Sequence, residues 1–314
     1  MKRSELLARM DLQIPAAAQI RVIVCSDVAN EADDPFAVVH HLLTPAFDVR
    51  GVIAAHFEGK SGDGTSMEQS YRGLQTLLDA AELEDVPALR GCAAPLAAED
   101  DAPDSEGVRF LIREALRPDP RTLYVTVLGA LTDVAAAIAR CPQIAARMTV
   151  VWIGGGPYPH GMREFNLMQD PAAARAVFAS PAALWQIPLN VYASMEVTLA
   201  ELAARVRPCG AAGAYLYRQL ADYNCRTFQP GGNLRRGENW CLGDQPAVGV
   251  LLQCPMRGNW HTCPAPRIRG DMTYAPDPGG KMIRVYDAVD PRMILEDLYA
   301  KLKLCYGERR KVEL

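Results

Sequence analysis

Short apolar runs and amphipathic segments alternate along the first two thirds of the chain. Apolar runs of six or seven residues are typical of buried strands, and the segments between them repeat apolar residues at helical spacing. This alternation predicts an α/β fold with a mainly parallel open β-sheet flanked by helices. The predicted strands are Ile20–Cys25, Val49–Ala55, Thr122–Leu128, Met148–Ile153 and Ala183–Leu189, and the predicted helices are Pro35–Leu43, Ser66–Ala81, Val108–Leu116, Leu131–Cys141 and Asp170–Ser180.

The pattern changes after Asn190. Helical segments follow one another at Thr198–Val206 and Ala211–Tyr223, a polar loop covers Cys225–Trp240, and Met282–Leu304 has the pattern of a strand and a closing helix. The sequence contains no internal repeat, low-complexity tract or linker rich in proline and serine. We therefore expect one domain over residues 1–314, with a helical elaboration in its C-terminal third.

Composition and charge exclude several classes of partner. The 314 residues are 49% hydrophobic with a formal net charge of -4, so we expect neither nucleic acid nor an anionic membrane as partner. Charges throughout the first 15 residues argue against a signal peptide, and no apolar run approaches the roughly 20 residues of a membrane span. The balance of charge favours a small polar ligand or a protein partner. The 9 cysteines lack zinc-site spacing, so we expect free thiols in a cytoplasmic protein.

Carboxylates are concentrated in the loop that follows the first predicted strand. The segment Ser26–Phe36 contains Asp27, Asp33 and Asp34, and parallel sheets bind ligands at the loops that leave the carboxyl ends of their strands. The hard oxygen atoms of aspartate suit calcium or magnesium, although the EF-hand pattern is absent. The alternative is that Asp33 or Asp34 only caps the helix that begins near Pro35.

Four segments of the chain resemble motifs of the inosine-uridine-preferring nucleoside hydrolase family, in the family's order. The loop SDVANEADD resembles DTDPGxDD, and LGALTDVAAAIARCP is similar to GPLTNxAxAL. IGGG followed by EFNLMQDPAAARAVF is similar to the MGG and AEFNxxxDPEAA motifs, and LGDQPAVGVLL resembles HDPxAxxxxL. The matches cover residues 21–254. The resemblance implies a nucleoside hydrolase-like fold with a Rossmann-like core.

The resemblance also implies an activity. Members of the family hydrolyse the N-glycosidic bond of ribonucleosides to ribose and free base, in purine and pyrimidine salvage, and they use a bound Ca²⁺ that holds the ribose 2′- and 3′-hydroxyls and the attacking water. A carboxylate-rich rim suits this chemistry, because the ion lowers the pKa of the water and an aspartate takes its proton. We therefore expect a hydrolase for a small nucleoside that, as family members commonly do, forms homodimers or homotetramers.

Several residues match the family's functional positions individually. Asp34, the second aspartate of the pair, and Asp244 of the LGDQP segment correspond to Ca²⁺ ligands. The backbone carbonyl of Leu128 corresponds to the family's main-chain ligand. Glu164 and Asn166 of the EFN segment correspond to residues that hydrogen-bond the ribose hydroxyls. The alternatives are a second helix cap at Asp244 and an exposed loop charge at Glu164.

The identity of the catalytic base is open, because this chain departs from the usual loop. Counting back from the aspartate pair places Asp27 on the family's first aspartate and Ala29 on the next, which is normally a metal ligand and the base. We expect Asp27 to take both roles, with Asn30 or Glu31 assisting at the substrate. Asp33 is the second candidate for the base.

Other departures concern the substrate. Gly243 stands where the inosine-uridine enzymes carry a histidine that could protonate the leaving base, and His56 and Glu58 replace the ribose-binding asparagine that follows the second strand. These changes resemble a divergent branch of the family with NExDD and GDxP motifs, so we expect a modified or unusual nucleoside. Trp240 could stack on its base. The candidate acids are His56, Glu58, His160 and Glu238, each of which could instead be a solvated loop residue.

Two other functions are compatible with the sequence. A non-hydrolytic module that binds a sugar or ribosyl ligand would explain the missing histidine and asparagine. A metal-dependent phosphohydrolase could use the same aspartates, but the sequence has neither a glycine-rich phosphate loop with a lysine nor a DxDxT-like nucleophile. The N-glycosidase is therefore the preferred hypothesis.

Overall fold

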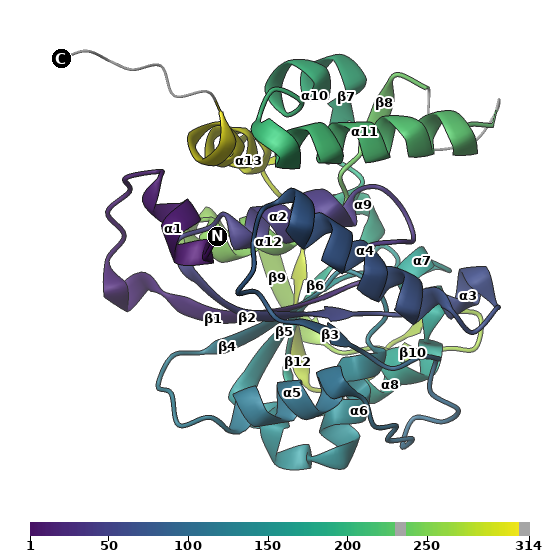
Figure 1. The fold of residues 1–314 in the computed structure, drawn as a ribbon. Coiled ribbons are helices and arrows are strands. Elements are labelled where there is room, and N and C mark those ends of the chain that lie inside the picture. The colour runs from purple at the N-terminus through teal and green to yellow at the C-terminus, as the bar shows by residue number, and fades with distance from the viewer. Residues whose placement is uncertain (230–236, 308–314) are drawn as a thin grey trace, which may run out of the picture.

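The computed structural model describes residues 1–229 and 237–307. Within these ranges an eight-stranded sheet has the order β3-β2-β1-β4-β5-β6-β12-β9, and all neighbouring strands are parallel except β12 and β9 (Figure 1). Its strands are β1 (Ile20–Ser26), β2 (Phe47–Ala54), β3 (Ala88–Arg90), β4 (Leu123–Val127), β5 (Met148–Ile153), β6 (Ala183–Ile187), β9 (Trp260–Pro264) and β12 (Met282–Tyr286).

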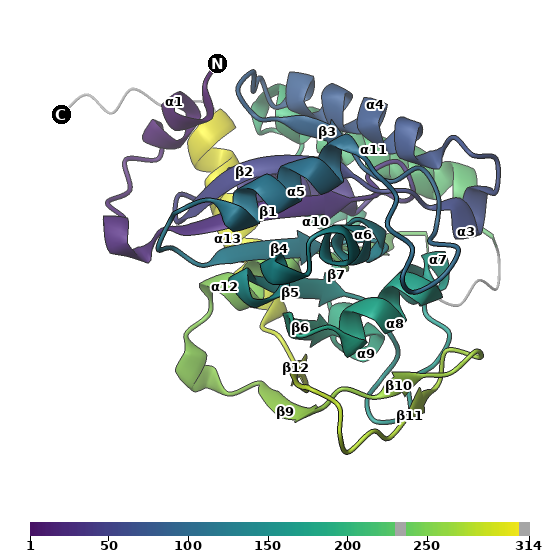
Figure 2. The same cartoon turned by 90° about the horizontal axis from the view of Figure 1, so that it is seen from below.

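Helices cover both faces of this sheet (Figures 1 and 2). Successive strand residues point to opposite faces, so β1 places Val22 and Val24 in one apolar core and Ile23 and Cys25 in the other. The first core is closed by α1 (Arg3–Ala8), α2 (Asp34–Leu42), α4 (Ser66–Ala80) and α12 (Pro246–Leu252), and the second by α5 (Glu106–Leu116), α6 (Thr132–Arg140) and α8 (Pro171–Ala179).

A further layer of helices lies outside α2, α4 and α12 and is drawn at the top of Figure 1. It consists of α10 (Leu199–Arg205), α11 (Gly210–Thr227) and α13 (Pro291–Tyr306), and α11 packs against both α4 and α13. The predicted helical elaboration of an α/β fold is therefore confirmed.

Short elements complete the described chain. They are α3 (Glu58–Ser61), α7 (Phe165–Gln169), α9 (Leu189–Tyr192), 3₁₀ turns at Ala16–Ala18, Pro142–Arg147 and Pro255–Arg257, and two antiparallel pairs, β7 (Glu196–Thr198) with β8 (Asn239–Cys241) and β10 (Arg267–Ile268) with β11 (Tyr274–Ala275).

The five strands and five helices predicted before Asn190 are all present, with ends shifted by a few residues. The two helices predicted after it, and the strand and closing helix predicted over Met282–Leu304, are also present as α10, α11, β12 and α13. The short strands β3, β7 and β8 were not predicted, because three residues are too few to show a period. Of the predicted polar loop Cys225–Trp240, the first residues continue α11, the last form β8, and residues 230–236 lie outside the described ranges. All 9 cysteines are free, and no helix in the described ranges is long and apolar enough to cross a membrane.

The sheet brings four chain segments to one edge. In register, Cys25 of β1 lies beside Val127 of β4, and Val127 lies beside Trp152 of β5. Trp152 in turn lies beside Gln186 of β6, so the segments that leave these four parallel strands start from neighbouring points. This carboxyl edge is where ligands bind in open α/β sheets.

The contact between α10 and α11 provides a test of the helical layer. A Cβ atom added at Gly213 would lie 2.1 Å from the backbone oxygen of Val206. We expect Gly213→Ala to lower the free energy of unfolding by about 1–3 kcal/mol, because a backbone oxygen cannot turn aside as a side chain can.

Urea denaturation followed by circular dichroism measures this loss. The control is Gly270→Ala, where an added Cβ meets nothing within 4 Å and the free energy should change by less than about 0.5 kcal/mol. Equal effects of the two substitutions would contradict the close helix contact.

Candidate active site

A cavity of about 210 Å³ opens at the carboxyl edge of the sheet. Its walls come from the segments that follow β1, β4, β5, β6 and β8, which lie far apart in the sequence. Nine of the residues predicted from the sequence as functional line it: Asp27, Asn30, Glu31, Asp33, Asp34, Leu128, Glu164, Asn166 and Asp244.

A larger cavity, of about 570 Å³, lies at the opposite edge, beside the amino ends of β4 and β5. Two of the arginines that line it are engaged within the protein. Arg121 pairs with Asp119 and Asp48 at 2.7 and 2.9 Å, and Arg21 donates to the backbone oxygens of Arg121 and Glu114. We therefore place the chemistry in the smaller, carboxylate-lined cavity.

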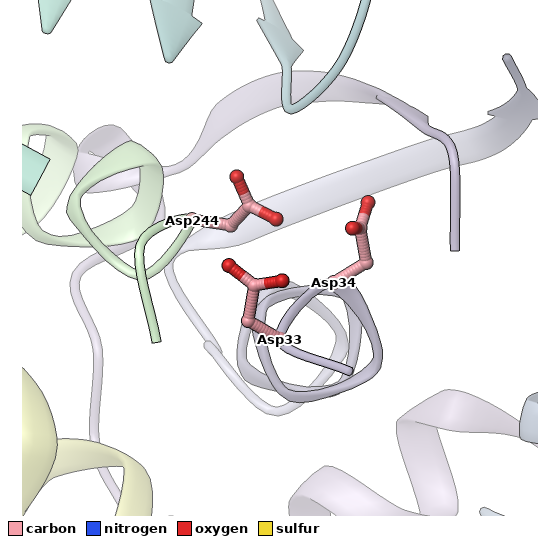
Figure 3. A group of neighbouring side chains, drawn as sticks. All are labelled: Asp33, Asp34 and Asp244. Atoms are coloured by element: carbon pink, nitrogen blue, oxygen red, sulfur yellow. The ribbon is translucent and has the colours of Figure 1, made fainter. Parts of the chain in front are cut away.

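Three carboxylates in this cavity face one another (Figure 3). Asp33 and Asp34 stand at the start of α2, and Asp244 stands just before α12. One oxygen from each of the three lies within 4.8 Å of the others, with Asp34 and Asp244 buried and Asp33 partly buried. We call these residues the aspartate trio. They come from loops 210 positions apart in the chain, so only the fold brings them together.

Burial and crowding act strongly on these carboxyl groups. Burial raises the pKa of Asp34 to about 6. A hydrogen bond that its Oδ1 accepts from Ser26 Oγ at 2.6 Å acts in the opposite direction and lowers this pKa. Burial, followed by the charge of Asp34, raises the pKa values of Asp33 and Asp244 well above the usual range. Carboxylates this close favour a shared proton or a shared cation.

Asp27 lies in the same cavity but outside the trio. Its side chain is 1% exposed, and its Oδ2 is buried without a hydrogen-bond partner. Burial and the charge of Asp34 raise its pKa well above the usual value. A Cβ atom at Gly129 would lie 2.3 Å from Asp27 Oδ1, so only glycine leaves room for this carboxylate.

The donor atoms of the cavity fit a hard cation. The trio supplies carboxylate oxygens, Asp27 supplies a buried oxygen with no partner, and Leu128 lines the same space. Calcium and magnesium take such oxygen ligands. Sequence reasoning treated Asp33 only as a second candidate for the base, and its place in the trio adds it to the candidate ligands.

Glu164 is held by three hydrogen bonds. Its Oε2 accepts from the backbone N–H groups of Gly155 and Leu167 at 2.7 and 3.0 Å, and its Oε1 accepts from the Tyr192 hydroxyl at 2.6 Å. Because it caps α7 and is 4% exposed, Glu164 is a fixed part of the cavity wall and not a solvated loop charge.

Asn166 ties two strand ends together beneath the cavity. Its Nδ2 donates to the carbonyls of Leu128 and Ile153 at 2.7 and 2.9 Å, so both amide protons are used. The side-chain oxygen is therefore the atom of Asn166 that can face a ligand.

Tyr192 was not predicted from the sequence, although it lies in the segment that follows β6. Burial, followed by the charge of Glu164, raises the pKa of its hydroxyl well above the usual value. A Cβ atom added at Gly243 would lie 3.0 Å from Cδ2 of its ring. The Tyr192 ring therefore stands beside Gly243, where a larger residue would place its side chain.

The β7–β8 pair brings two further unpredicted residues to the cavity. Glu196 of β7 lies opposite Cys241 of β8, and both line the cavity. Burial, followed by the charges of Asp33, Glu196 and Glu31, raises the pKa of the Cys241 thiol to about 12. The β7–β8 pair therefore adds a carboxylate and a thiol to the cavity wall.

Lys60 of α3 is a further residue that the sequence analysis missed. Its Nζ donates to the backbone oxygen and to Oδ1 of Asn30 at 2.8 and 2.7 Å, and to the Tyr223 hydroxyl at 3.2 Å. It lies 5.7 Å from the ring centre of Phe165, which lines the cavity. Lys60 thus holds the Asn30 loop in place.

The structure places His56 and Glu58 away from the cavity, and the expectation that they contact substrate is corrected. The His56 side chain is fully buried, its Nε2 lies 2.7 Å from Thr132 Oγ1, and burial lowers its pKa. Glu58 accepts from the N–H groups of Gly64 and Ser66, each at 2.9 Å. Both side chains therefore hold local structure.

Trp240 also does not line the cavity, so its predicted stacking on a base is corrected. Its side chain is 2% exposed and packs edge-on against Tyr223, with ring centres 5.6 Å apart. Alternate residues of a strand point to opposite sides, so Cys241 and not Trp240 turns toward the cavity. His160 and Glu238, the remaining candidate acids, are exposed and lie outside the lining.

Comparison with known proteins agrees with this geometry. The sequence profile of the inosine-uridine preferring nucleoside hydrolase family matches residues 22–294. The chain belongs to this family. It is therefore an enzyme of the nucleoside hydrolase type, and the resemblance seen in its four sequence motifs is confirmed.

Individual relatives are distant. The chain is 24% identical over 216 residues to the pyrimidine-specific ribonucleoside hydrolase of Salmonella arizonae. The aligned region covers 61% of this chain and 67% of that protein. It is 24% identical over 237 residues to the non-specific ribonucleoside hydrolase of Escherichia coli O127:H6, covering 68% and 75% respectively. The purine-preferring ribonucleoside hydrolase from Gardnerella vaginalis shares the fold, with a TM-score of 0.74, 20% identity and coverage of 91% of this chain and 99% of that one.

The crowded trio leads to a test of cation binding. We expect Asp244→Asn to raise the melting temperature of the metal-free protein by about 2 °C, because it removes like-charge repulsion. The same substitution should abolish most of the rise in melting temperature that Ca²⁺ produces in the unsubstituted protein, because it removes a ligand.

Differential scanning fluorimetry with and without Ca²⁺ measures both effects. Asp79→Asn, at an exposed position of α4, is the control and should change neither value. An unsubstituted protein whose melting temperature does not respond to Ca²⁺ would rule out the site.

Proposed function

We propose that the chain hydrolyses the N-glycosidic bond of a ribonucleoside with a modified or unusual base, in a Ca²⁺-dependent reaction that yields ribose and free base. The observation that carries this proposal is the trio of carboxylates at the carboxyl edge, with the unpartnered Oδ2 of Asp27 in the same cavity. Family membership supports the reaction class.

Asp33, Asp34, Asp244 and the Leu128 carbonyl are the proposed ligands of the ion, with Asp27 as an additional ligand. When bound, Ca²⁺ would orient the ribose diol and make a water molecule more acidic. The protein supplies a fixed arrangement of oxygens. Ser26 restrains Asp34, and Asn166 restrains the Leu128 carbonyl.

Asp27 is the proposed general base. Its Oδ2 receives no hydrogen bond, so it has a lone pair for the proton of the attacking water, and burial favours the protonated carboxyl that results. Its Oδ1 packs beneath Gly129, which fixes the direction of the carboxylate. Asp33 belongs to the trio that we propose as ligands of the ion, whereas Asp27 has an oxygen without a hydrogen-bond partner. We therefore favour Asp27 over Asp33 as base.

We propose that three residues bind the ribose: Glu164, Asn166 and Tyr192. Glu164 keeps free lone pairs after accepting its three hydrogen bonds, and Asn166 has its side-chain oxygen left. Both can accept hydrogen bonds from ribose hydroxyls. Asn30 and Glu31, which also line the cavity, are the proposed further substrate contacts.

Ribose release from a panel of purine, pyrimidine and modified nucleosides tests the proposal. We expect activity that EDTA removes and Ca²⁺ restores, and a loss of about 10²–10⁴-fold in kcat for Asp27→Asn, as is typical when a general base is removed. In Asp33→Asn the larger effect should be on Ca²⁺ affinity, measured by calorimetry.

Asp79→Asn serves again as the control and should retain full activity. If Asp33→Asn loses the turnover while Asp27→Asn retains it, the two roles are reversed. If no nucleoside is cleaved but ribosyl ligands bind in a Ca²⁺-dependent way, the protein is a binding module and the hydrolase proposal fails.

Tyr192 provides a separate test of ribose binding. Tyr192→Phe keeps the ring beside Gly243 but removes the hydroxyl that donates to Glu164. We expect KM to rise by about fivefold to tenfold, which corresponds to the roughly 1 kcal/mol that one hydrogen bond typically contributes. Steady-state kinetics on the best substrate of the panel measure this change. An unchanged KM would show that ribose binding does not depend on the Tyr192 hydroxyl.

Assembly and location stay predictions. We expect a homodimer or homotetramer, to be checked by analytical ultracentrifugation, and a cytoplasmic enzyme with a small-molecule substrate and no nucleic-acid or membrane partner.

A further inference from the structure

The aspartate trio is carried by two different helices, and a buried side-chain contact joins these helices. Asp33 and Asp34 stand at the start of α2, whereas Asp244 directly precedes Gln245, which begins α12. His40 of α2 has its Nδ1 2.7 Å from Oε1 of Gln245, and both side chains are fully buried. The contact therefore connects the two helices whose ends supply the trio.

The other side of the His40 ring is held by α13. Its Nε2 lies 2.9 Å from Asp297 Oδ2, and Asp297 also pairs with Lys301. The Nζ of Lys301 donates to Thr44 Oγ1 at 3.0 Å, and the Thr44 hydroxyl donates to the backbone oxygen of His40 at 2.7 Å. These contacts form a closed cycle, so both the ring and the backbone of His40 are fixed against α13.

The start of α12 is arranged for the same contact. A residue at the position of Gln245 commonly caps its helix with its side chain, but Gln245 makes no such cap bond and contacts α2 instead. Further along α12, a Cβ atom added at Gly249 would lie 2.3 Å from Cδ1 of Ile294 in α13. Helix α12 is therefore packed closely against α13 while Gln245 reaches α2.

The neighbouring histidine has a different environment. His41 is as deeply buried as His40, but its Nδ1 lies 2.7 Å from the backbone oxygen of Ala37, within α2 itself. Its ring packs near Phe47, with ring centres 6.0 Å apart. His41 thus offers a matched comparison, because it shares the helix and the burial of His40 without the contact to α12.

Resting on the proposed ion site, we propose that His40 is a positioning residue that sets the distance between the α2 and α12 carboxylates of the trio through Gln245. Like charges on the two helix ends push the helices apart, and the contact opposes this separation. His40 lies about 9 Å along the helix axis from Asp34, so a shift of the helix at one position carries to the other. An ion that binds carboxylates of both helices requires a fixed spacing.

Calcium titrations by calorimetry test this role. His40→Leu and Gln245→Met break the contact from either side. Each should lower the affinity for Ca²⁺ by about threefold to tenfold, less than the 10–100-fold typical of a group that hydrogen-bonds a metal ligand directly. The double variant should lose little more than either single variant, because both remove the same contact. His40→Asn, whose amide can occupy the position of Nδ1, should recover most of the affinity.

His41→Leu is the matched control and should change the affinity for Ca²⁺ by less than about twofold, because its contact lies within one helix. Circular dichroism confirms that each variant is folded. If His41→Leu lowers the affinity as much as His40→Leu, the effect comes from general loosening of α2 and the inference is overturned.

Melting temperatures of the metal-free protein decide the inference separately from the proposed function. Asp244→Asn relieves repulsion, and its gain of about 2 °C should fall below about 1 °C when combined with His40→Leu, because the carboxylates can then already separate. Combined with His41→Leu, the gain should stay complete. An equal gain in all three backgrounds would contradict a spacing role of His40. If the unsubstituted protein binds no Ca²⁺, the proposed ion site fails, and these melting temperatures still decide whether His40 sets the spacing.

Discussion

Mutual repulsion among buried carboxylates is the constraint on which this structure depends. Asp27, Asp33, Asp34 and Asp244 meet in one small cavity, and burial and proximity oppose ionisation of all four. An arrangement that lowers stability persists only when the surrounding structure holds it and a ligand uses it. The sheet keeps these residues in place, because the loops that carry them start at its rigid carboxyl edge.

Local details of the fold make the crowding possible. The trio stands at the starts of α2 and α12, where helix dipoles favour negative charge. Gly129 leaves space for Asp27, and Ser26 donates a hydrogen bond to Asp34. Each is a small contribution from a residue that does not line the cavity. Together they place four acidic side chains in one cavity at the edge of a stable sheet.

The fold could be predicted from short-range patterns of apolar residues, and the acidic residues of the cavity could be named from motifs that resemble those of the family. Apolar runs located β1, β2, β4, β5, β6 and β12, and motif order located Asp34, Asp244 and Glu164. Side-chain direction could not be predicted in the same way. His56 follows a strand end yet turns into the core, and Trp240 differs from Cys241 only in strand register.

The position of Tyr192 beside Gly243 has an evolutionary consequence. A histidine introduced at position 243 would meet the Tyr192 ring, and removal of that ring would release Glu164 from its hydroxyl donor. The position where a histidine could assist a leaving base and the proposed sugar-binding residue Glu164 are thus linked through one aromatic side chain. Substitutions at positions 192 and 243 are therefore expected to be non-additive, so an exchange of one chemistry for the other would need changes at both positions.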